Sequence, residues 1–326
     1  MTKSINLVAD IGGTNIRLGI ADDTGDIRSL TVFQCREYPG LADVLKKYIA
    51  DNGLAQYSIN ACLAIACPVD NDLIAMTNLP WSFSKSAIKT ELKLNKLLLI
   101  NDYTAIAHSV PYLTDEQKVQ IGQGQPVAGR PISICGPGTG LGVANVVPNG
   151  DSWISLGGEG GHVDFAPIDA TEQHILNFLL KKYSHVSYEQ LLSGLGIEQI
   201  YQALCDYHGD TPEQYSAKDI SGKAVDNSCP RCVEALAQFC KTLGSFAGNL
   251  SLNLGSFAGV YIAGGIAPRF IEFIKNSDFR ARFEEKGRLS AFNQNIPTYI
   301  ITESQPGILG SLAYLRQHNK EELSRD

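Results

Sequence analysis

The amino-acid sequence predicts an α/β protein with two domains, and three observations support this prediction. The chain has 326 residues, of which 44% are hydrophobic, so it can bury a large core of the size that usually splits into two domains. Residues 5–33 alternate β-branched and polar side chains around two turn signals, Gly12-Gly13 and Asp22–Gly25, which indicates three antiparallel strands. A second glycine hairpin at residues 131–147 begins the same pattern again.

Helix and strand alternate after the first three predicted strands. Residues 41–51 have the spacing of an amphipathic helix. Its apolar face comprises Leu41, Val44, Leu45, Tyr48 and Ile49. Residues 62–67 and 96–100 are continuously apolar, as expected of strands that are covered on both faces. A β-meander followed by alternating helix and strand resembles an RNase H-like fold.

The second half of the chain repeats this order with different residues. After its hairpin we expect a strand at 153–156, a helical region at about 170–208, a core helix at 233–254, a strand at 260–268 that ends in a glycine turn, and a tail helix at 307–317. Small residues of the core helix permit close packing: Gly244, Ala247 and Gly248.

A domain boundary near residue 111 accounts for this repetition. It gives a small domain of residues 1–111, to which a C-terminal helix at about 303–326 returns, and a large domain of residues 112–302. We expect the two glycine hairpins to face each other across an active-site cleft.

Composition excludes several classes of partner. The net charge of -7, the isoelectric point near 5.4 and the lack of any Lys/Arg-rich run argue against nucleic acid and anionic membranes. No apolar stretch approaches the ~20 residues that span a bilayer, and the first residues do not form an apolar signal segment. Eight scattered cysteines fit a reduced cytoplasm.

Cys229-Pro-Arg-Cys232 is the one close cysteine pair. A redox or zinc motif would require a thioredoxin-like βαβ setting or a second pair of ligands nearby, and neither is visible. We therefore expect structural thiols at the start of a helix.

The two glycine turns have the composition of a phosphate clamp. Gly12-Gly13-Thr14 and Gly138-Thr139-Gly140 can each bring backbone N–H groups and a hydroxyl close to an oxyanion. Asp10, at the end of the first strand, can hold Mg²⁺ through a water molecule. The pair of turns predicts an ATP-dependent phosphotransferase rather than two plain hairpins.

Two other phosphate-binding motifs are excluded. A dinucleotide-binding turn would continue into a helix, whereas Val143–Val147 is β-rich. No Gly-x-x-x-x-Gly-Lys-Ser/Thr sequence occurs, so the chain is not a P-loop enzyme.

Asn101-Asp102 directly follows an apolar strand, where ligands of α/β sheets are usually bound. A carboxylate at this place can accept the proton of an attacking sugar hydroxyl. Asn and Asp are also favoured N-cap residues, so these two side chains could instead cap a helix that starts near Thr104. The segment alone does not decide between these interpretations.

The segment Gly157–Asp164 surrounds one carboxylate with four glycines, and an imidazole follows. Glu159 and His162 can bond the vicinal hydroxyls of a sugar. A zinc site at His162 would require cysteines close behind it, and none occurs before Cys205. Glu189, taken alone, has the position of an acid in the first turn of a helix.

Ten segments together resemble the bacterial-type glucokinase family of the sugar kinase/Hsp70/actin superfold, over residues 5–316. They are Asp10–Thr14, Ala66–Pro68, Met76–Asn78, Ile100–Asp102, Gly138–Gly142, Gly158–Pro167, Leu192–Gly194, Asn249–Gly255, Ile262–Ile266 and Pro306–Gly310. The resemblance implies two actin-like ATPase domains and the transfer of phosphate from ATP to the 6-hydroxyl of D-glucose, feeding glycolysis, with the domains closing over the sugar. It also implies a homodimer.

The resemblance assigns roles to individual residues. It makes Asp102 the general base and moves Glu189 into the sugar site. The implied sugar ligands are Asn101, Asp102, Glu159, His162 and Glu189. The implied ATP ligands are Gly12, Gly13, Thr14 and Asn15 with Gly138, Thr139 and Gly140 at the phosphates, and Gly264 and Gly265 on the adenosine side. Mg²⁺ would be carried by ATP, near Asp10.

Related proteins suggest two other functions. The repressor/kinase (ROK) group carries a cysteine-rich zinc motif after its histidine, but this chain has Val163–Pro167 instead, so the zinc does not transfer. A sugar-sensing regulator would usually add a DNA-binding domain, yet the first strand begins by residue 5. An actin- or Hsp70-like ATPase would lack the glycine-rich block around Glu159. The sequence leaves ADP and polyphosphate open as alternative phosphate donors.

Overall fold

A computed structural model describes residues 3–21, 26–76 and 79–323 of the chain. The chain divides into two compact units, Met1–Leu113 with Glu303–Asp326, and Thr114–Thr302. The predicted turn at Asp22–Gly25 and the residues Thr77 and Asn78 of one family segment lie outside the described residues.

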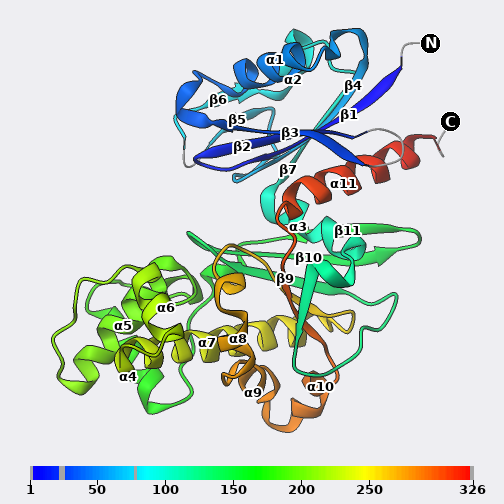
Figure 1. Ribbon diagram of the computed structural model, residues 1–326. Helices are drawn as coiled ribbons and strands as arrows, with labels where there is room; N and C mark the ends of the chain where they lie inside the picture. Colours follow the sequence, from blue (N-terminus) through cyan, green and yellow to red (C-terminus); the bar gives the residue numbers. More distant parts are fainter. Residues whose placement is uncertain (1–2, 22–25, 77–78, 324–326) are drawn as a thin grey trace. The chain divides into compact units, whose positions relative to one another are not determined.

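The first unit is a five-stranded sheet in the order β3-β2-β1-β4-β7 with helices on both faces (Figure 1). Its strands are β1 (Ser4–Ile11), β2 (Asn15–Ala21), β3 (Ile27–Gln34), β4 (Ser58–Ile65) and β7 (Lys96–Asn101), with β5 (Leu73–Ala75) and β6 (Ser82–Ser84) forming a separate pair. Its helices are α1 (Leu41–Asp51), α2 (Lys85–Glu91), α3 (Asp102–Ser109) and α11 (Pro306–Leu323), with short 3-10 turns at Cys35–Glu37, Leu54–Gln56 and Val110–Tyr112.

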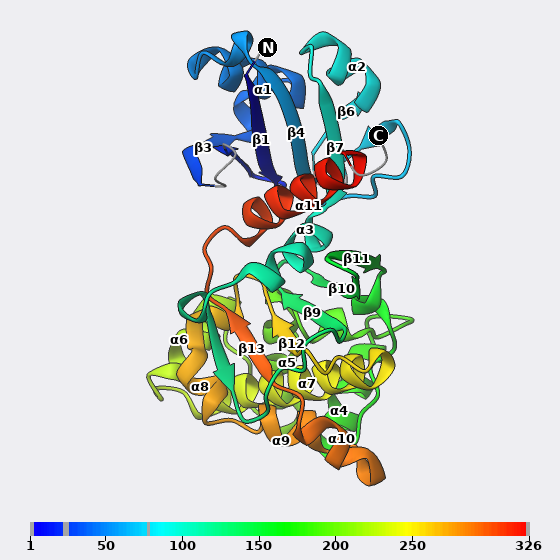
Figure 2. The same cartoon turned by 90° about the vertical axis from the view of Figure 1, so that its right-hand side faces the viewer.

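The core of the first unit lies on both faces of this sheet. On one face, α1 buries Leu41, Val44, Leu45 and Tyr48 as its spacing predicted, while Ile49 is only partly buried. On the other face, α11 packs against α3, β1 and β4 (Figure 2). The close approach of α11 to α3 requires Gly310, because a Cβ there would overlap the carbonyl oxygen of Ala105.

The second unit is a six-stranded sheet in the order β11-β10-β9-β12-β13-β8. Its strands are β8 (Lys118–Ile121), β9 (Ile132–Pro137), β10 (Leu141–Asn149), β11 (Ser152–Gly157), β12 (Val260–Ile262) and β13 (Thr298–Ile301). Its helices are α4 (Ala170–Leu180), α5 (Gly194–His208), α6 (Ala217–Val225), α7 (Pro230–Leu254), α8 (Ile271–Lys275), α9 (Phe279–Glu284) and α10 (Ser290–Gln294), with 3-10 turns at Asp115–Gln117, Gly160–His162, Tyr188–Gln190, Ala267–Phe270 and Gly287–Leu289.

Helix α7 is the centre of the second core, and α5, α6 and α9 pack against it. The prediction that its small residues permit close packing is confirmed. A Cβ on Gly244 would overlap the carbonyl oxygen of Phe279, and one on Gly248 would lie 2.5 Å from that of Phe283. Helix α9 therefore lies directly on the backbone of α7.

The two units share one strand topology, which confirms the predicted α/β class and the repetition in the sequence. In the first unit, β1, β2 and β3 form an antiparallel meander, and β1, β4 and β7 run parallel. In the second unit, β9, β10 and β11 form the same meander, and β9, β12 and β13 run parallel. Strand β8 is an additional antiparallel neighbour of β13.

The long apolar helices of the described residues belong to these packed cores. No helix in this part of the chain has the length and hydropathy that crossing a membrane requires.

Candidate active site

The carboxyl ends of three parallel strands bring the acidic residues of the first unit to one edge of its sheet. In the register, Ile11 of β1 pairs with Ile65 of β4, and Ile65 pairs with Asn101 of β7. Asp10 and Asp102 therefore lie at the same edge, although 92 positions separate them in the chain. This is the edge at which open α/β sheets bind ligands.

Asn101 caps helix α3, so the capping interpretation holds for this residue. Its side-chain oxygen accepts the backbone N–H groups of Tyr103 at 2.9 Å and Thr104 at 3.3 Å. The cap starts the helix at Asp102, two residues earlier than the sequence predicted. It also leaves Asp102 in the first turn, with the carboxylate directed by the backbone beside it.

The Asp102 carboxyl has an unusually high proton affinity. Burial raises its pKa to about 6, and the nearby charge of Asp10 adds to this rise. Hydrogen bonds from the backbone N–H groups of Tyr103 and Asp102 and from the Asn101 side chain oppose it. A carboxyl with a pKa of about 6 is ionised at neutral pH yet basic enough to take a proton.

Asp10 lies next to Arg17 and to the start of α11. Its carboxylate is 3.6 Å from the Arg17 guanidinium, and burial raises its pKa while the Arg17 charge lowers it. A Cβ on Gly307 would lie 3.0 Å from the Asp10 carboxyl carbon. The neighbouring turn is closed by a 3.0 Å hydrogen bond from the Gly12 N–H to the Asn15 carbonyl. Gly12, Gly13, Thr14 and Asn15 thus form the tight β1–β2 hairpin.

The second glycine turn joins β9 to β10 and is held from two sides. The Gly138 N–H bonds the Gly140 carbonyl at 2.8 Å, and the Gly138 carbonyl accepts the Gly194 N–H at 2.9 Å. Gly194 is the first residue of α5, which Ser193 caps through the N–H of Gly196. The positive end of this 15-residue helix therefore lies against the turn.

Glu189 contacts the same turn, which its position in the sequence did not indicate. It lies in the 3-10 turn Tyr188–Gln190, and its carboxylate accepts the Leu141 N–H at 2.8 Å. A Cβ on Gly140 would lie 2.5 Å from this carboxylate. His162 Nε2 is 3.8 Å from the other carboxylate oxygen. The structure therefore brings Glu189, His162 and the second hairpin together within one unit.

The glycines of the segment Gly157–Asp164 have a packing role. Gly160 and Gly161 lie against β10, since a Cβ at either position would press into Val143 or overlap the carbonyl oxygen of Leu141. Glu159 and His162 are exposed beside them. The exposed pair is accessible to a polar ligand.

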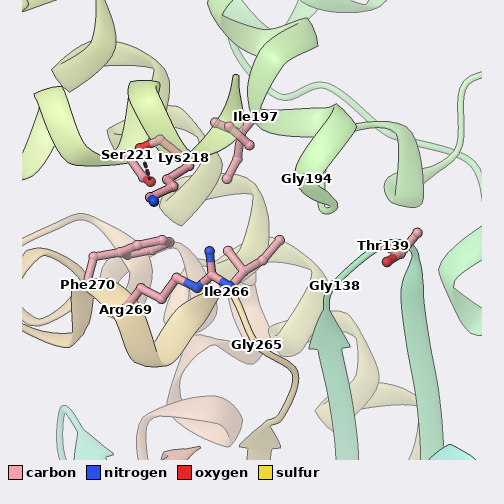
Figure 3. A pocket seen from close by; sticks show the side chains of 11 residues that line it. Gly138, Thr139, Gly194, Ile197, Lys218, Ser221, Gly265, Ile266, Arg269 and Phe270 are labelled. Carbon is pink, nitrogen blue, oxygen red and sulfur yellow. Dashed lines mark hydrogen bonds between the residues drawn. The ribbon is translucent and has the colours of Figure 1, made fainter. Parts of the chain in front are cut away.

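A pocket of about 420 Å³ adjoins the second hairpin (Figure 3). Figure 3 shows Lys218 and Ser221 of α6 opposite Arg269 and Phe270. Its lining residues are Gly138, Thr139, Gly194, Ile197, Ala217, Lys218, Ser221, Gly265, Ile266, Arg269 and Phe270. Two cations, apolar side chains and bare backbone meet in it, a combination that suits a nucleotide.

The predicted residues Gly264 and Gly265 lie beside this pocket. Gly265 lines it, while Gly264 has a φ of +83° and packs on the carbonyl of Pro137, at the end of β9. The side chains of Lys218, Ser221, Arg269 and Phe270 were not predicted from the sequence. No local motif marks them, because helices and turns that are distant in the chain supply them.

Metal ligands are not concentrated at either hairpin. Within the described residues, no group of three or more His, Cys, Asp and Glu side chains could hold a metal ion. Asp10 can therefore offer a metal ion one carboxylate, in the manner of a Mg²⁺ that is bound mostly by phosphates and water.

Known proteins resemble this chain over nearly its whole length. The family model described as Glucokinase matches residues 7–318. A glucokinase from Colwellia psychrerythraea is 59% identical over 97% of this chain and 97% of its own. One from Yersinia pestis is 48% identical over 98% of each chain. The crystal structure of a glucokinase from an Antarctic psychrotroph superposes with a TM-score of 0.89 at 35% identity, covering 96% of this chain and 99% of its own.

The repeated α/β topology with a glycine hairpin in each unit is the actin-like ATPase fold of sugar kinases, which the solved glucokinase shares. The family model and the relatives specify the class further. The chain belongs to the glucokinase family.

Proposed function

We propose that this protein transfers the γ-phosphoryl group of ATP to the 6-hydroxyl of D-glucose and releases glucose 6-phosphate and ADP. The observation that carries the proposal is the partly buried Asp102 carboxyl at the carboxyl end of β7, with a pKa of about 6. Carboxyl groups with a strongly raised pKa are concentrated at functional sites, and a general base that takes the proton of a hydroxyl requires such a pKa. Family membership supplies the reaction in which such a base is used.

In this proposal, Asp102 accepts the proton of the attacking hydroxyl. Asn101 and the Tyr103 N–H hold the carboxylate in place through hydrogen bonds. The proposed ligands of the sugar hydroxyls are Asn101, Asp102, Glu159, His162 and Glu189. Since Glu189 also accepts the Leu141 N–H, it would couple the position of the sugar to that of the second hairpin.

The pocket beside the second hairpin is the proposed nucleotide site. Ile197, Ile266 and Phe270 can cover a base, while Lys218 and Arg269 can neutralise phosphate charge. The N-terminus of α5 at Gly194 adds a positive dipole. The phosphates would meet Gly138, Thr139 and Gly140 and, on the first unit, Gly12, Gly13, Thr14 and Asn15.

The Asp10 carboxylate beside the first hairpin can bind Mg²⁺. The Asp10 carboxylate is a hard oxygen ligand, and it is partly exposed beside the turn. Bound with ATP, the ion would neutralise charge on the transferring phosphoryl group. Arg17, 3.6 Å from Asp10, would hold the carboxylate in position.

We further propose a homodimer in the cytoplasm, in line with the family resemblance. All eight cysteines of the chain are free thiols, which fits a reducing compartment.

A coupled assay of ADP release tests the proposal. ADP release that requires both ATP and glucose supports it. Release without sugar would indicate an ATPase, and no release with any sugar would indicate a sensor. The same assay is then run with glucose, mannose, fructose and glucosamine, each in combination with ATP, ADP and polyphosphate. It shows which sugar accepts the phosphoryl group and which compound donates it.

A further inference from the structure

Two cysteines enclose the first turn of α7. Cys229 is the N-cap residue, with extended backbone at φ -140° and ψ 108°, and Pro230 starts the helix. The Cys229 sulfur accepts the N–H of Cys232 at 3.4 Å, and the two thiols also share a side-chain hydrogen bond. Cys232 is fully buried, whereas Cys229 is partly exposed. Cys229 is therefore accessible to a small oxidant, whereas Cys232 is shielded from solvent.

The surroundings favour a thiolate at Cys229 and a thiol at Cys232. Burial raises the pKa of Cys229, but hydrogen bonds from Cys232 and Arg231 and the charge of Lys223 outweigh it, so the pKa lies below its ordinary value. Burial raises the pKa of Cys232 to about 12. The start of a 25-residue helix adds a positive dipole at Cys229. A reactive sulfur next to a buried partner is the arrangement used in thiol redox chemistry.

The residues around this turn hold it in place through ion pairs and do not form a metal site. Arg231, between the two cysteines, bonds Asp210 at 2.9 Å and also pairs with Glu234. A third buried thiol, Cys205, is near enough to interact electrostatically with both sulfurs, and it is hydrogen-bonded to Tyr201. These three thiols do not form a group that could hold a metal among the described residues.

In place of the purely structural thiols that the sequence led us to expect, we propose that Cys229 and Cys232 form a reversible disulfide, with Cys229 as the attacking sulfur and Cys232 as the resolving one. With a peroxide as oxidant, the Cys229 thiolate attacks one peroxide oxygen, the O–O bond breaks, and a sulfenic acid and hydroxide form. The Cys232 thiol then attacks that sulfur, the S–O bond breaks, and the oxygen leaves as water. In sum, two thiols and one hydrogen peroxide give one disulfide and two waters. A dithiol reductant reverses the change by exchange.

Formation of the disulfide can affect the pocket through helix α6. The three residues 226–228 join α6 to Cys229, and their N–H groups bond back to carbonyls of Gly222, Ala224 and Lys223 in α6. The sulfurs must approach to a bond length of about 2 Å, which removes the Cys229 sulfur from the Cys232 N–H. Ala217, Lys218 and Ser221 of α6 line the pocket. In our proposal, oxidation of the turn therefore shifts these three residues and changes the shape of the pocket.

Peptide mapping of the full-length protein tests the disulfide directly. After treatment with hydrogen peroxide near neutral pH, we expect non-reducing digestion to give a peptide containing Cys229 and Cys232 that is two hydrogens lighter, and dithiothreitol to restore its mass. Cys205→Ser is the matched control and should behave identically. In Cys232→Ser, dimedone should trap a sulfenic acid at Cys229, and in Cys229→Ser neither product should form.

The wild-type map alone can overturn the proposal, whatever the variants do. A disulfide that includes Cys205, a Cys229 oxidised to sulfinic acid beside a free Cys232, or two unmodified thiols at peroxide levels that oxidise other cysteines would each refute it.

The effect on the pocket is measured separately and rests on the proposed function. We expect the oxidised protein to show a KM for ATP raised by about fivefold or more, with an unchanged KM for glucose. Equal KM values for ATP in the oxidised and reduced forms would refute the coupling to α6. Failure of the proposed function would instead appear as a reduced protein without glucose-dependent ADP release.

Discussion

Asp102→Asn is the sharpest test of the site, because it removes the proposed base and little else. The asparagine retains an oxygen that can accept the Tyr103 N–H, now 3.0 Å from the Asp102 carboxylate, and leaves the Asn101 cap in place. Loss of a general base typically costs ~10²–10⁴ in rate. We therefore expect kcat to fall by about that factor while glucose still binds. In the unchanged protein, kcat/KM for glucose should fall as the pH drops through about 6.

The same substitution should stabilise the fold at neutral pH. The folded-state pKa of Asp102 is raised from 3.8 to about 6, so the stability linked to its proton is complete below 3.8 and lost as the pH rises through about 6. A difference of about two pKa units at about 1.4 kcal/mol each sets an upper limit of about 3 kcal/mol. The neutral amide avoids this cost. The gain in the free energy of unfolding should grow between about pH 4 and pH 6 and stay constant above pH 7.

Both effects are measured on one preparation, by the coupled assay and by urea unfolding from pH 5 to pH 8. Asp151→Asn, on the exposed turn between β10 and β11, is the matched control and should change neither quantity. A variant with near-normal kcat would show that another group is the base. A variant that lost activity without any gain in stability would show that the pKa of the Asp102 carboxyl is not raised in the folded protein.

Three further substitutions test other parts of the structure. In Gly140→Ala, the added methyl group meets Glu189 at 2.5 Å, so the KM for glucose should rise at least about tenfold in a steady-state assay. Lys218→Met should raise the KM for ATP but not for glucose, and equal KM values in both proteins would remove Lys218 from the nucleotide site. Gly310→Ala should lower the free energy of unfolding by about 3 kcal/mol, because its methyl group overlaps Ala105, and an unchanged urea midpoint would contradict that packing.

Most elements of the fold could be predicted from the sequence, because their periodicity and turn residues agree. The boundaries were less predictable. Helix α7 starts at Pro230 rather than at 233, since Cys229 supplies the cap and proline suits the first helical position. Strand β12 ends at Ile262 instead of extending to 268, because Gly264 has a φ of +83° that a strand does not adopt.

The candidate site also has a part that could be predicted from the sequence and a part that could not. The position of Asp10 and Asn101 at one edge of the sheet follows from the parallel register, in which Ile11, next to Asp10, is level with Asn101. Apolar strands that end in polar residues indicate such an edge in the sequence. Glu189 lies in the first turn of a 3-10 helix, as its position in the sequence predicted, but its hydrogen bond with the Leu141 N–H could not be predicted, because Leu141 lies 48 positions away in the chain. Contacts of this kind depend on tertiary packing and leave no local pattern.

The two units differ beside their glycine hairpins although they share one topology. Both hairpins close with a backbone hydrogen bond, from Gly12 to Asn15 and from Gly138 to Gly140. The chemistry beside them has diverged. Strand β1 carries Asp10 one position before its end at Ile11, whereas the hairpin register gives Gly136 as the corresponding residue of β9, and Gly264 packs on the carbonyl of the next residue, Pro137. A carboxylate at position 136 would place negative charge close to the proposed nucleotide pocket, which Gly138 lines, and a glycine at position 10 would remove the proposed ligand of the metal ion. The two units therefore share the turn and differ in the charge beside it, as their separate roles in the proposed reaction would require.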